Sequence, residues 1–133
     1  MATRLGFIGF GIMGARLLRA ALNHDKSVIS VTGAYDPSGA TAAKLHDIDP
    51  NLTAFGSAAD VIAASDCLHI ASPPSSHQSY LSQCCEAGRA ALCEKPLSTN
   101  VEETKTAVDA LTANGMRAGV NFPLASSFAG DYL

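Results

Sequence analysis

The sequence predicts an α/β protein built on a doubly wound parallel sheet. Apolar runs of strand length alternate along the chain with amphipathic segments of helix length. The strand runs are continuously apolar, which is typical of a parallel sheet covered by helices on both faces. Six such runs joined by right-handed crossovers fit the strand order 3-2-1-4-5-6.

The first half of the chain contains three predicted strands, each followed by a predicted helix. Leu5–Phe10 is a short apolar run, and apolar residues then recur at helical spacing from Ile12 until Asn23. Further strands are predicted over Val28–Tyr35 and Leu52–Phe55, and further helices over Pro37–His46 and Ala58–Ala64.

The second half repeats the alternation. After a strand over Cys67–Ala71, a helix over Ser75–Ala87 is predicted to stop at Gly88, where a left-handed cap fits. Its expected buried stripe consists of His77, Leu81, Cys84 and Cys85. The last two strands are predicted over Ala90–Cys93 and Met116–Val120, and the helix between them is predicted to start at a capping box of Thr99 and Glu102 and to end at Gly115.

Length and composition favour one compact domain with a sizeable core. The 133 residues are 47% hydrophobic and 16% charged, with a net charge of −3. A chain with this acidic balance lacks the basic field that nucleic-acid binding needs. No apolar run reaches the roughly 18 residues of a membrane span, and the N-terminus lacks a signal-peptide pattern. We therefore expect a cytoplasmic protein whose partners are small molecules or other proteins.

The four cysteines match no metal-binding or redox motif. They include an adjacent pair but no C-x-x-C spacing: Cys67, Cys84, Cys85 and Cys93. We expect free, mostly buried thiols and no metal site. Three histidines have no partners at ligand spacing and receive no role from the sequence: His24, His46 and His69.

The strongest chemical signal is the segment Gly9-Phe10-Gly11-Ile12-Met13-Gly14. A G-x-G-x-x-G pattern alone is weak, but this one follows a predicted strand and opens a predicted helix. Gly9 permits a tight turn, Gly11 lets a pyrophosphate reach the backbone N–H groups at the helix start, and Gly14 lets the helix pack closely on the sheet. The alternative is that the glycines serve only the turn. The context favours a dinucleotide site formed by this segment.

Asp36 lies at the end of the second predicted strand, 22 residues after Gly14. A carboxylate there can accept hydrogen bonds from both hydroxyls of an adenosine ribose. The alternative is that Asp36-Pro37-Ser38 caps the next helix, with proline at its first position. No arginine follows Asp36, and the nearest cation downstream is Lys44. A 2′-phosphate would therefore meet negative charge, which favours NAD over NADP.

Two polar segments follow the fourth and fifth predicted strands: Ser72-Pro73-Pro74-Ser75-Ser76-His77 and Glu94-Lys95-Pro96. Because the carboxyl ends of parallel strands meet at one edge of a sheet, we expect both segments beside the glycine turn. With the adenosine over the second strand, the nicotinamide would reach the fourth and fifth strands, near Lys95. His77 falls in the first turn of its helix, where a neutral ring is preferred, and is either a packing residue or part of the site.

Together these segments resemble one known family. GFIGFGIMG, AYDPS, HIASPPSSHQSYLSQCCEAGRAALCEKPLSTNVEET and GVNF are similar to the N-terminal half of the glucose–fructose oxidoreductase, inositol dehydrogenase and rhizopine catabolism (Gfo/Idh/MocA) family, from about Arg4 to Phe122. The most specific part is P-x-x-x-H (Pro73 to His77) together with E-K-P (Glu94 to Pro96). The β-hydroxyacid dehydrogenases share a similar glycine motif but lack this pair.

The resemblance implies the Rossmann domain of an NAD(P)-dependent oxidoreductase that acts on a sugar, polyol or related hydroxy compound. In this family the E-K-P lysine, here Lys95, lies beside the nicotinamide and contacts the substrate or the cofactor ribose. A positioned ammonium suits this chemistry, because it can hold or polarise an oxygen that loses a proton while carbon loses hydride. The resemblance thus implies Lys95 as the catalytic residue and extends the cofactor contacts to Ser72, Pro73, His77, Glu94, Lys95 and Asn121.

Family members continue into a second α/β domain that supplies most substrate contacts and the oligomer interface, and this chain resembles only the first domain. We expect a dinucleotide-binding domain over residues 1–120 and the start of a connection to the missing second domain over residues 121–133. Relatives often place an arginine near the Asn-Phe pair, whereas here Asn121-Phe122 leads into Pro123-Leu124 without a cation.

Two functions remain open at the level of sequence. The chain is either the cofactor domain of an oxidoreductase, which binds NAD but does not turn over alone, or a stand-alone dinucleotide-binding module such as a sensor or partner subunit. In both cases we expect self-association as a dimer through the edge of the sixth strand or through nearby apolar residues. These residues are Phe122, Leu124, Phe128, Tyr132 and Leu133.

Overall fold

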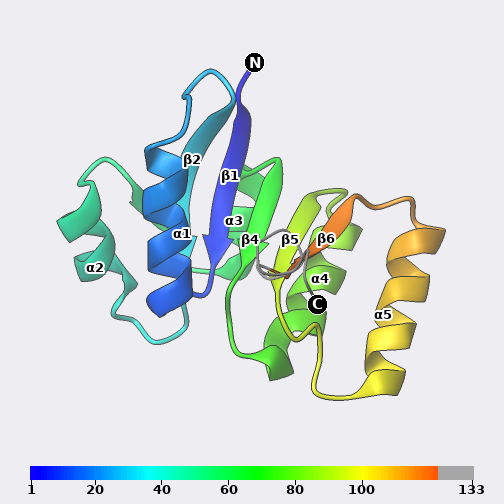
Figure 1. Cartoon of the computed structure of the whole chain (residues 1–133). Coiled ribbons are helices and arrows are strands. Elements are labelled where there is room, and N and C mark those ends of the chain that lie inside the picture. Colours follow the sequence, from blue (N-terminus) through cyan, green and yellow to red (C-terminus); the bar gives the residue numbers. More distant parts are fainter. Residues whose placement is uncertain (123–133) are drawn as a thin grey trace, which may run out of the picture.

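The computed structural model describes residues 1–122 and confirms the doubly wound parallel sheet (Figure 1). The six strands form one sheet in the order β3-β2-β1-β4-β5-β6. Every neighbouring pair is parallel, so all carboxyl ends point to the same edge. The strands are β1 (Thr3–Ile8), β2 (Ile29–Tyr35), β3 (Thr53–Ala54), β4 (Cys67–Ile70), β5 (Ala90–Glu94) and β6 (Ala118–Asn121).

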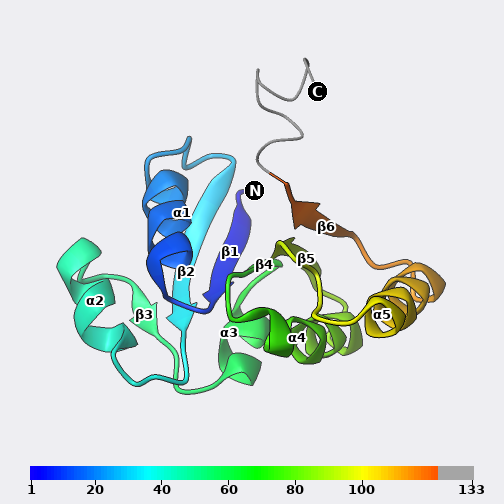
Figure 2. The ribbon, with the colours of Figure 1, turned by 60° about the horizontal axis from the view of Figure 1, so that its bottom comes forward.

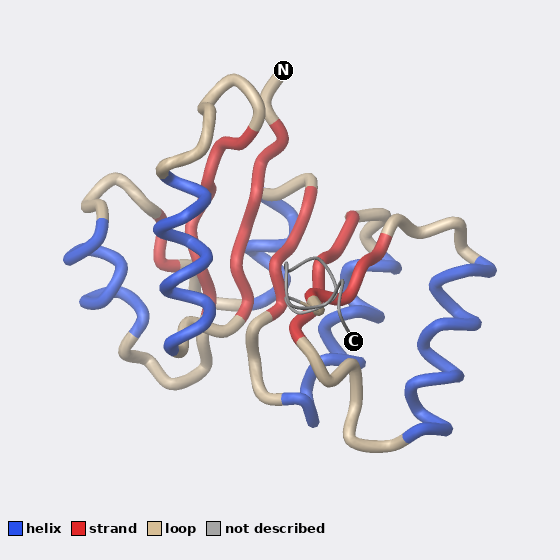
Figure 3. The backbone as a smooth tube through the Cα atoms, in the orientation of Figure 1, coloured by secondary structure: helices blue, strands red, loops and turns tan. Residues whose placement is uncertain are grey.

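Helices cover both faces of this sheet. They are α1 (Ile12–Leu22), α2 (Thr41–Ile48), α3 (Ala58–Ala64), α4 (Pro74–Glu86) and α5 (Val101–Ala113). Figure 2 shows α1 and α2 on one side and α3, α4 and α5 on the other, and Figure 3 shows the strands as a single layer between them. Among the described residues, no helix is long and apolar enough to cross a membrane.

The core divides into two clusters, one on each face of the sheet. Phe7 of β1 belongs to the cluster under α1 and α2 and packs with Leu18. The next residue, Ile8, belongs to the cluster under α3 and α4, which includes Leu81. Successive side chains of β1 thus bury on opposite faces, which explains why its run is continuously apolar. By contrast, α5 contributes no fully buried residue to either cluster.

The start of α2 differs from the sequence prediction. The helix begins at Thr41 rather than Pro37, and its N-cap position is Ala40, without a side-chain bond. Asp36 does not cap it, because its Oδ1 instead accepts a hydrogen bond from the Ser38 N–H at 2.8 Å, in a local turn that runs into Gly39 with φ of 72°. The capping alternative for Asp36 was therefore wrong.

The start of α5 also corrects a prediction. The cap is Asn100, not Thr99, because the Asn100 side-chain oxygen accepts hydrogen bonds from the N–H groups of Glu102 and Glu103 at 2.8 and 3.3 Å. The predicted end of α4 is confirmed, since Gly88 follows it with a left-handed φ of 64°. The remaining elements lie within two residues of their predicted bounds.

The buried stripe of α4 is confirmed at His77, Leu81 and Cys84, whereas Cys85 is only half-buried. All four cysteines are free. Cys84 and Cys93 are 0% exposed, and burial raises the pKa of each thiol to about 12. Because the thiolate is the nucleophile, these two side chains are inert packing groups in the folded chain.

We expect Cys84 and Cys93 to resist an aromatic disulfide reagent at about pH 8 until the protein is unfolded. The sharpest form of the test is a Cys67→Ser/Cys85→Ser double variant, which retains only the two buried thiols. Absorbance should report no fast-reacting thiol in buffer and two in denaturant. Rapid labelling of the folded double variant would contradict the buried positions.

Candidate functional site

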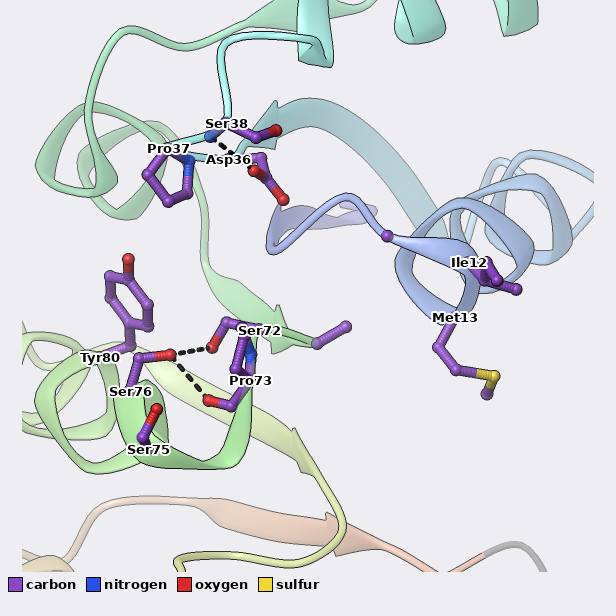
Figure 4. Close-up of a pocket in the computed structure, with 12 residues that line it drawn as sticks. Ile12, Met13, Asp36, Pro37, Ser38, Ser72, Pro73, Ser75, Ser76 and Tyr80 are labelled. Carbon is purple, nitrogen blue, oxygen red and sulfur yellow. Dashed lines mark hydrogen bonds between the residues drawn. The ribbon is translucent and has the colours of Figure 1, made fainter.

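A cleft of about 860 Å³ opens at the sheet edge where β1, β2 and β4 end (Figure 4). Its walls come from three segments: the glycine turn with the start of α1, the loop after β2, and the loop after β4 with the start of α4. The lining residues are Gly11, Ile12, Met13, Asp36, Pro37, Ser38, Ala71, Ser72, Pro73, Ser75, Ser76 and Tyr80.

The three motif glycines meet different surroundings. Gly9 has a φ of 89°, and a side chain there would press on the backbone of Ala71 and Ser72 at the end of β4. A side chain at Gly14 would collide with the carbonyl oxygen of Gly9. At Gly11 a Cβ would meet nothing within 4 Å. Two glycines therefore allow close packing, and the third leaves backbone open to the cleft.

The start of α1 presents free backbone donors to this opening. Gly11 is the N-cap and supplies no side-chain cap, and the first helical bond runs from the Ala15 N–H to the Gly11 carbonyl at 3.0 Å. The N–H groups before Ala15 therefore lack helical partners and carry the positive end of the helix dipole. Ile12 and Met13 beside them are 81% and 40% exposed. This wall combines apolar side chains with an environment that favours an anion.

Asp36, at the end of β2, forms the wall next to the glycine turn and is bonded to that turn. Its Oδ2 accepts a hydrogen bond from the Phe10 N–H at 2.7 Å, while Oδ1 accepts the bond from Ser38. Burial acts to raise the pKa of Asp36, but these bonds and the charge of Lys44 outweigh it and hold the pKa below its usual value. The carboxylate is therefore ionised at neutral pH.

The third wall is a row of hydroxyl groups. Ser76 Oγ lies 2.8 Å from both Ser72 Oγ and the carbonyl oxygen of Pro73. Tyr80, one turn further along α4, extends from the helix toward Pro37 (Figure 4). Burial raises its pKa, as do the nearby Tyr35 and Asp36, so its hydroxyl stays protonated at neutral pH. Ser76 belongs to the segment expected at this edge, but neither Ser76 nor Tyr80 received a role from the sequence, although their spacing of four residues puts both on one face of a helix.

A second polar group lies behind the E-K-P segment. Glu94, the last residue of β5, is 7% exposed, and its Oε1 accepts a hydrogen bond from Asn121 Nδ2 at 2.7 Å. The same oxygen lies 3.2 Å from Nε2 of His69, a residue of β4 to which the sequence assigned no role. Burial lowers the pKa of His69 even though Glu94 acts in the opposite direction, so the ring is neutral at neutral pH.

His77 is 1% exposed, and both of its ring nitrogens face backbone carbonyls. Nδ1 lies 2.9 Å from the Pro96 oxygen, and Nε2 lies 2.7 Å from the Ser72 oxygen. The ring therefore joins the loop after β4 to the turn after β5. Lys95, between the two anchored residues Glu94 and Pro96, is exposed.

The cleft brings together about half of the residues predicted to bind a cofactor. Its lining includes Gly11, Ile12, Met13, Asp36, Ser72 and Pro73. The other predicted residues lie outside that lining: Gly9, Phe10, Gly14, His77, Glu94, Lys95 and Asn121. The Phe10 side chain is 2% exposed within the core, so only its backbone reaches the site, through Asp36.

This combination of fold, glycine turn and strand-end carboxylate has a match among known proteins. The Gfo/Idh/MocA family model, described as an oxidoreductase family with an NAD-binding Rossmann fold, matches residues 3–122. The chain belongs to this family. Its sheet order and its glycine turn are those of a Rossmann domain.

Members of the Gfo/Idh/MocA family with curated names are similar over most of the chain. An inositol 2-dehydrogenase from Cereibacter sphaeroides is 34% identical over 118 residues, which are 88% of this chain and 35% of the relative. The rhizopine catabolism protein MocA from Rhizobium meliloti is 32% identical over 108 residues, 80% of this chain and 33% of the relative. The chain thus spans about a third of the length of these relatives.

Solved structures share the fold at lower identity. UDP-N-acetylglucosamine 3-dehydrogenase from Acidithiobacillus ferrooxidans superposes with a TM-score of 0.84 at 22% identity, covering 99% of this chain and 41% of that one. Biliverdin reductase from Synechocystis, solved with biliverdin and NADP⁺, gives a TM-score of 0.79 at 20% identity, covering 90% and 37%. These similarities support the Rossmann fold of this Gfo/Idh/MocA member.

The surroundings of Gly11 and Gly14 predict effects of different size on stability when each is replaced by alanine. Gly11→Ala should lower the free energy of unfolding by less than about 1 kcal/mol, because its Cβ has open space and the only cost is that alanine is a poorer N-cap than glycine. Gly14→Ala should lower the free energy of unfolding by about 1–3 kcal/mol, because its Cβ meets the Gly9 carbonyl. The better helix propensity of alanine offsets only part of this cost. Urea denaturation of the two variants measures the difference, and equal stabilities would contradict this division of roles.

Proposed function

We propose that the chain binds NAD(H) in this cleft and is the cofactor domain of an oxidoreductase that moves hydride between the nicotinamide and a polyol, sugar or related hydroxy compound. One observation carries the proposal: an ionised Asp36, bonded to the Phe10 N–H, lies at the cleft beside the open backbone at Gly11. That arrangement matches the two recognition needs of an adenosine diphosphate, an acceptor for ribose hydroxyls and donors for pyrophosphate.

The proposed binding mode follows from these walls. Each Asp36 oxygen accepts one backbone bond and retains acceptor capacity for a ribose hydroxyl. The pyrophosphate would lie over Gly11, where no side chain blocks the free N–H groups of α1. Exposed Ile12 and Met13 would be covered by the ligand, which accounts for apolar side chains at the cleft rim. The nicotinamide half then extends toward Ser72 and Lys95.

Charge favours NAD over NADP in this proposal. Asp36 is the only charged residue among the described residues that line the cleft. A 2′-phosphate beside it would place two negative groups in contact with no lining cation to compensate. Lys44 acts on Asp36 through its charge but does not line the cleft.

Lys95 is the proposed catalytic residue. It is exposed at the carboxyl end of β5, on the same edge of the sheet as the cleft. When a hydroxy compound is oxidised, hydride leaves carbon for the nicotinamide ring and a proton leaves oxygen. An ammonium group at that oxygen stabilises the negative charge that develops on it. The inositol dehydrogenases among the relatives favour a polyol substrate for the whole protein. Because this chain covers about a third of them, we expect it to bind cofactor without turnover.

We expect NADH to bind at least about tenfold more tightly than NADPH. Asp36→Asn should weaken the binding of NADH and reduce the difference in affinity between NADH and NADPH. The amide keeps an acceptor for the Phe10 N–H but removes the negative charge. Calorimetric titration of both nucleotides measures this. Asp47→Asn on α2, which is exposed, is a matched control that should change neither affinity, and Lys95→Ala should leave NADH binding nearly intact. Equal or tighter NADPH binding would remove the role given to Asp36.

We also propose that the chain self-associates as a dimer. Among the described residues, β6 pairs only with β5, so its other edge is open, and Phe122 beside it is 57% exposed. The other apolar residues named for this contact lie outside the described range: Leu124, Phe128, Tyr132 and Leu133. Sedimentation velocity at tens of micromolar should give a dimer that Phe122→Ser weakens. A monomer at that concentration would rule the contact out.

A further inference from the structure

Two histidines of one neighbouring strand–helix segment lie against the E-K-P turn, one on each side of the lysine. His69 of β4 meets Glu94 before the lysine, at 3.2 Å, and His77 of α4 meets Pro96 after it, at 2.9 Å. Between these two contacts, Lys95 is exposed. The residues on both sides of Lys95, Glu94 and Pro96, therefore contact the same unit, strand β4 and helix α4.

The His77 contacts are more specific than core packing requires. The ring is 1% exposed, and each nitrogen lies within hydrogen-bond distance of a carbonyl from a different loop, Ser72 at 2.7 Å and Pro96 at 2.9 Å. A neutral imidazole carries one N–H, so the ring donates a hydrogen bond to one of these two carbonyls, and its other nitrogen lies against the second. An apolar residue of similar size would leave the bonded carbonyl without this donor. With both nitrogens used in this way, the ring has no free nitrogen to offer a ligand.

Only one of the two loops that His77 joins lines the cleft. Ser72 and Pro73 line the cleft, whereas the turn after β5 carries Lys95 and lies outside that lining. The Ser72 side chain is further held by Ser76 at 2.8 Å, so the wall is braced on both sides. On the other side of the turn, α5 has no buried residue with which to hold it.

We propose that His77 is a positioning residue that clasps the Ser72–Pro73 wall of the cleft to the Lys95 turn and so sets the place of the lysine relative to bound nicotinamide. This rests on the proposed NAD(H) binding. His77 itself touches neither cofactor nor substrate; it acts through the Ser72 and Pro96 carbonyls. The Glu94–Asn121 bond fixes the start of the same turn independently. A clasp of this kind matters because small displacements of a reacting group cost large factors in rate.

The test separates the two halves of the cofactor. His77→Leu removes the ring contacts that hold the Ser72–Pro73 wall, toward which the nicotinamide half extends, so the isolated chain should lose about five- to tenfold in NADH affinity. Its affinity for ADP-ribose, which lacks the nicotinamide, should change less than about twofold. His77→Gln, which restores an amide donor, should recover part of the loss. His46→Leu on exposed α2 is the matched control and should change neither affinity. Titration calorimetry of the wild type and the three variants with both ligands measures these affinities.

Amide hydrogen exchange provides a readout that does not need the cofactor. In His77→Leu the Ser76 N–H, which bonds the Pro73 carbonyl at 2.9 Å, and the N–H groups at the end of β5 should exchange faster, while those of β1 keep their protection. If the wild-type chain binds neither ligand, the proposed function fails, and the exchange result still decides whether the clasp exists. Equal losses for NADH and ADP-ribose, or unchanged values for both, would overturn the positioning role.

A measurement on the wild-type chain covers the case in which His77→Leu does not fold. A buried, hydrogen-bonded imidazole N–H exchanges slowly enough for nuclear magnetic resonance to detect it. Such a proton on His77 should show nuclear Overhauser contacts with protons near the Pro96 or Ser72 carbonyl. Absence of a protected ring proton would overturn the clasp.

Discussion

The close contact between the glycine turn and the end of β4 is the constraint on which the site depends. Gly9 lies against the backbone of Ala71 and Ser72, and Gly14 lies against Gly9, so neither position has room for a side chain. This contact starts α1 at the edge of the sheet and turns its free donors outward. It also presents the Phe10 N–H to Asp36, which joins the glycine turn to the end of β2. The close packing at Gly9 and Gly14 therefore places both the start of α1 and Asp36 at the cleft.

The strand order and most element bounds could be predicted because the signals for them are local. Helix α3 occupies Ala58–Ala64 as predicted, since a capping serine and a short apolar repeat bound it. The start of α2 could not be predicted in the same way. Asp36 had two plausible local roles, and its position is fixed by the Phe10 N–H, 26 residues earlier in the chain. Long-range bonds of this kind leave no mark in the spacing of nearby residues.

In the candidate site, too, the residues with local sequence signals could be predicted and those placed by long-range contacts could not. The glycine motif and Asp36 were recognised from spacing, but whether Glu94 faces the cleft depends on the pairing of β5 with β6. In that register Glu94 lies directly opposite Asn121, and the two side chains bond to each other beside His69. A lone histidine in an apolar strand carries no signal for such a contact, which explains why His69 was overlooked. Tyr80 was overlooked because its link to Asp36 exists only once α4 packs beside the loop after β2.

Helix α5 has a consequence for the energetics of local opening. With no fully buried side chain, it should unfold locally at a lower free-energy cost than the central strands of the sheet. Helix α5 follows the E-K-P turn in the chain, so local unfolding of α5 would extend to Lys95 if the turn had no other contacts. The bonds of Glu94 and Pro96 to neighbouring elements break that path. The Lys95 turn should therefore keep its structure when α5 opens, because its two flanking residues are bonded to the sheet and to α4.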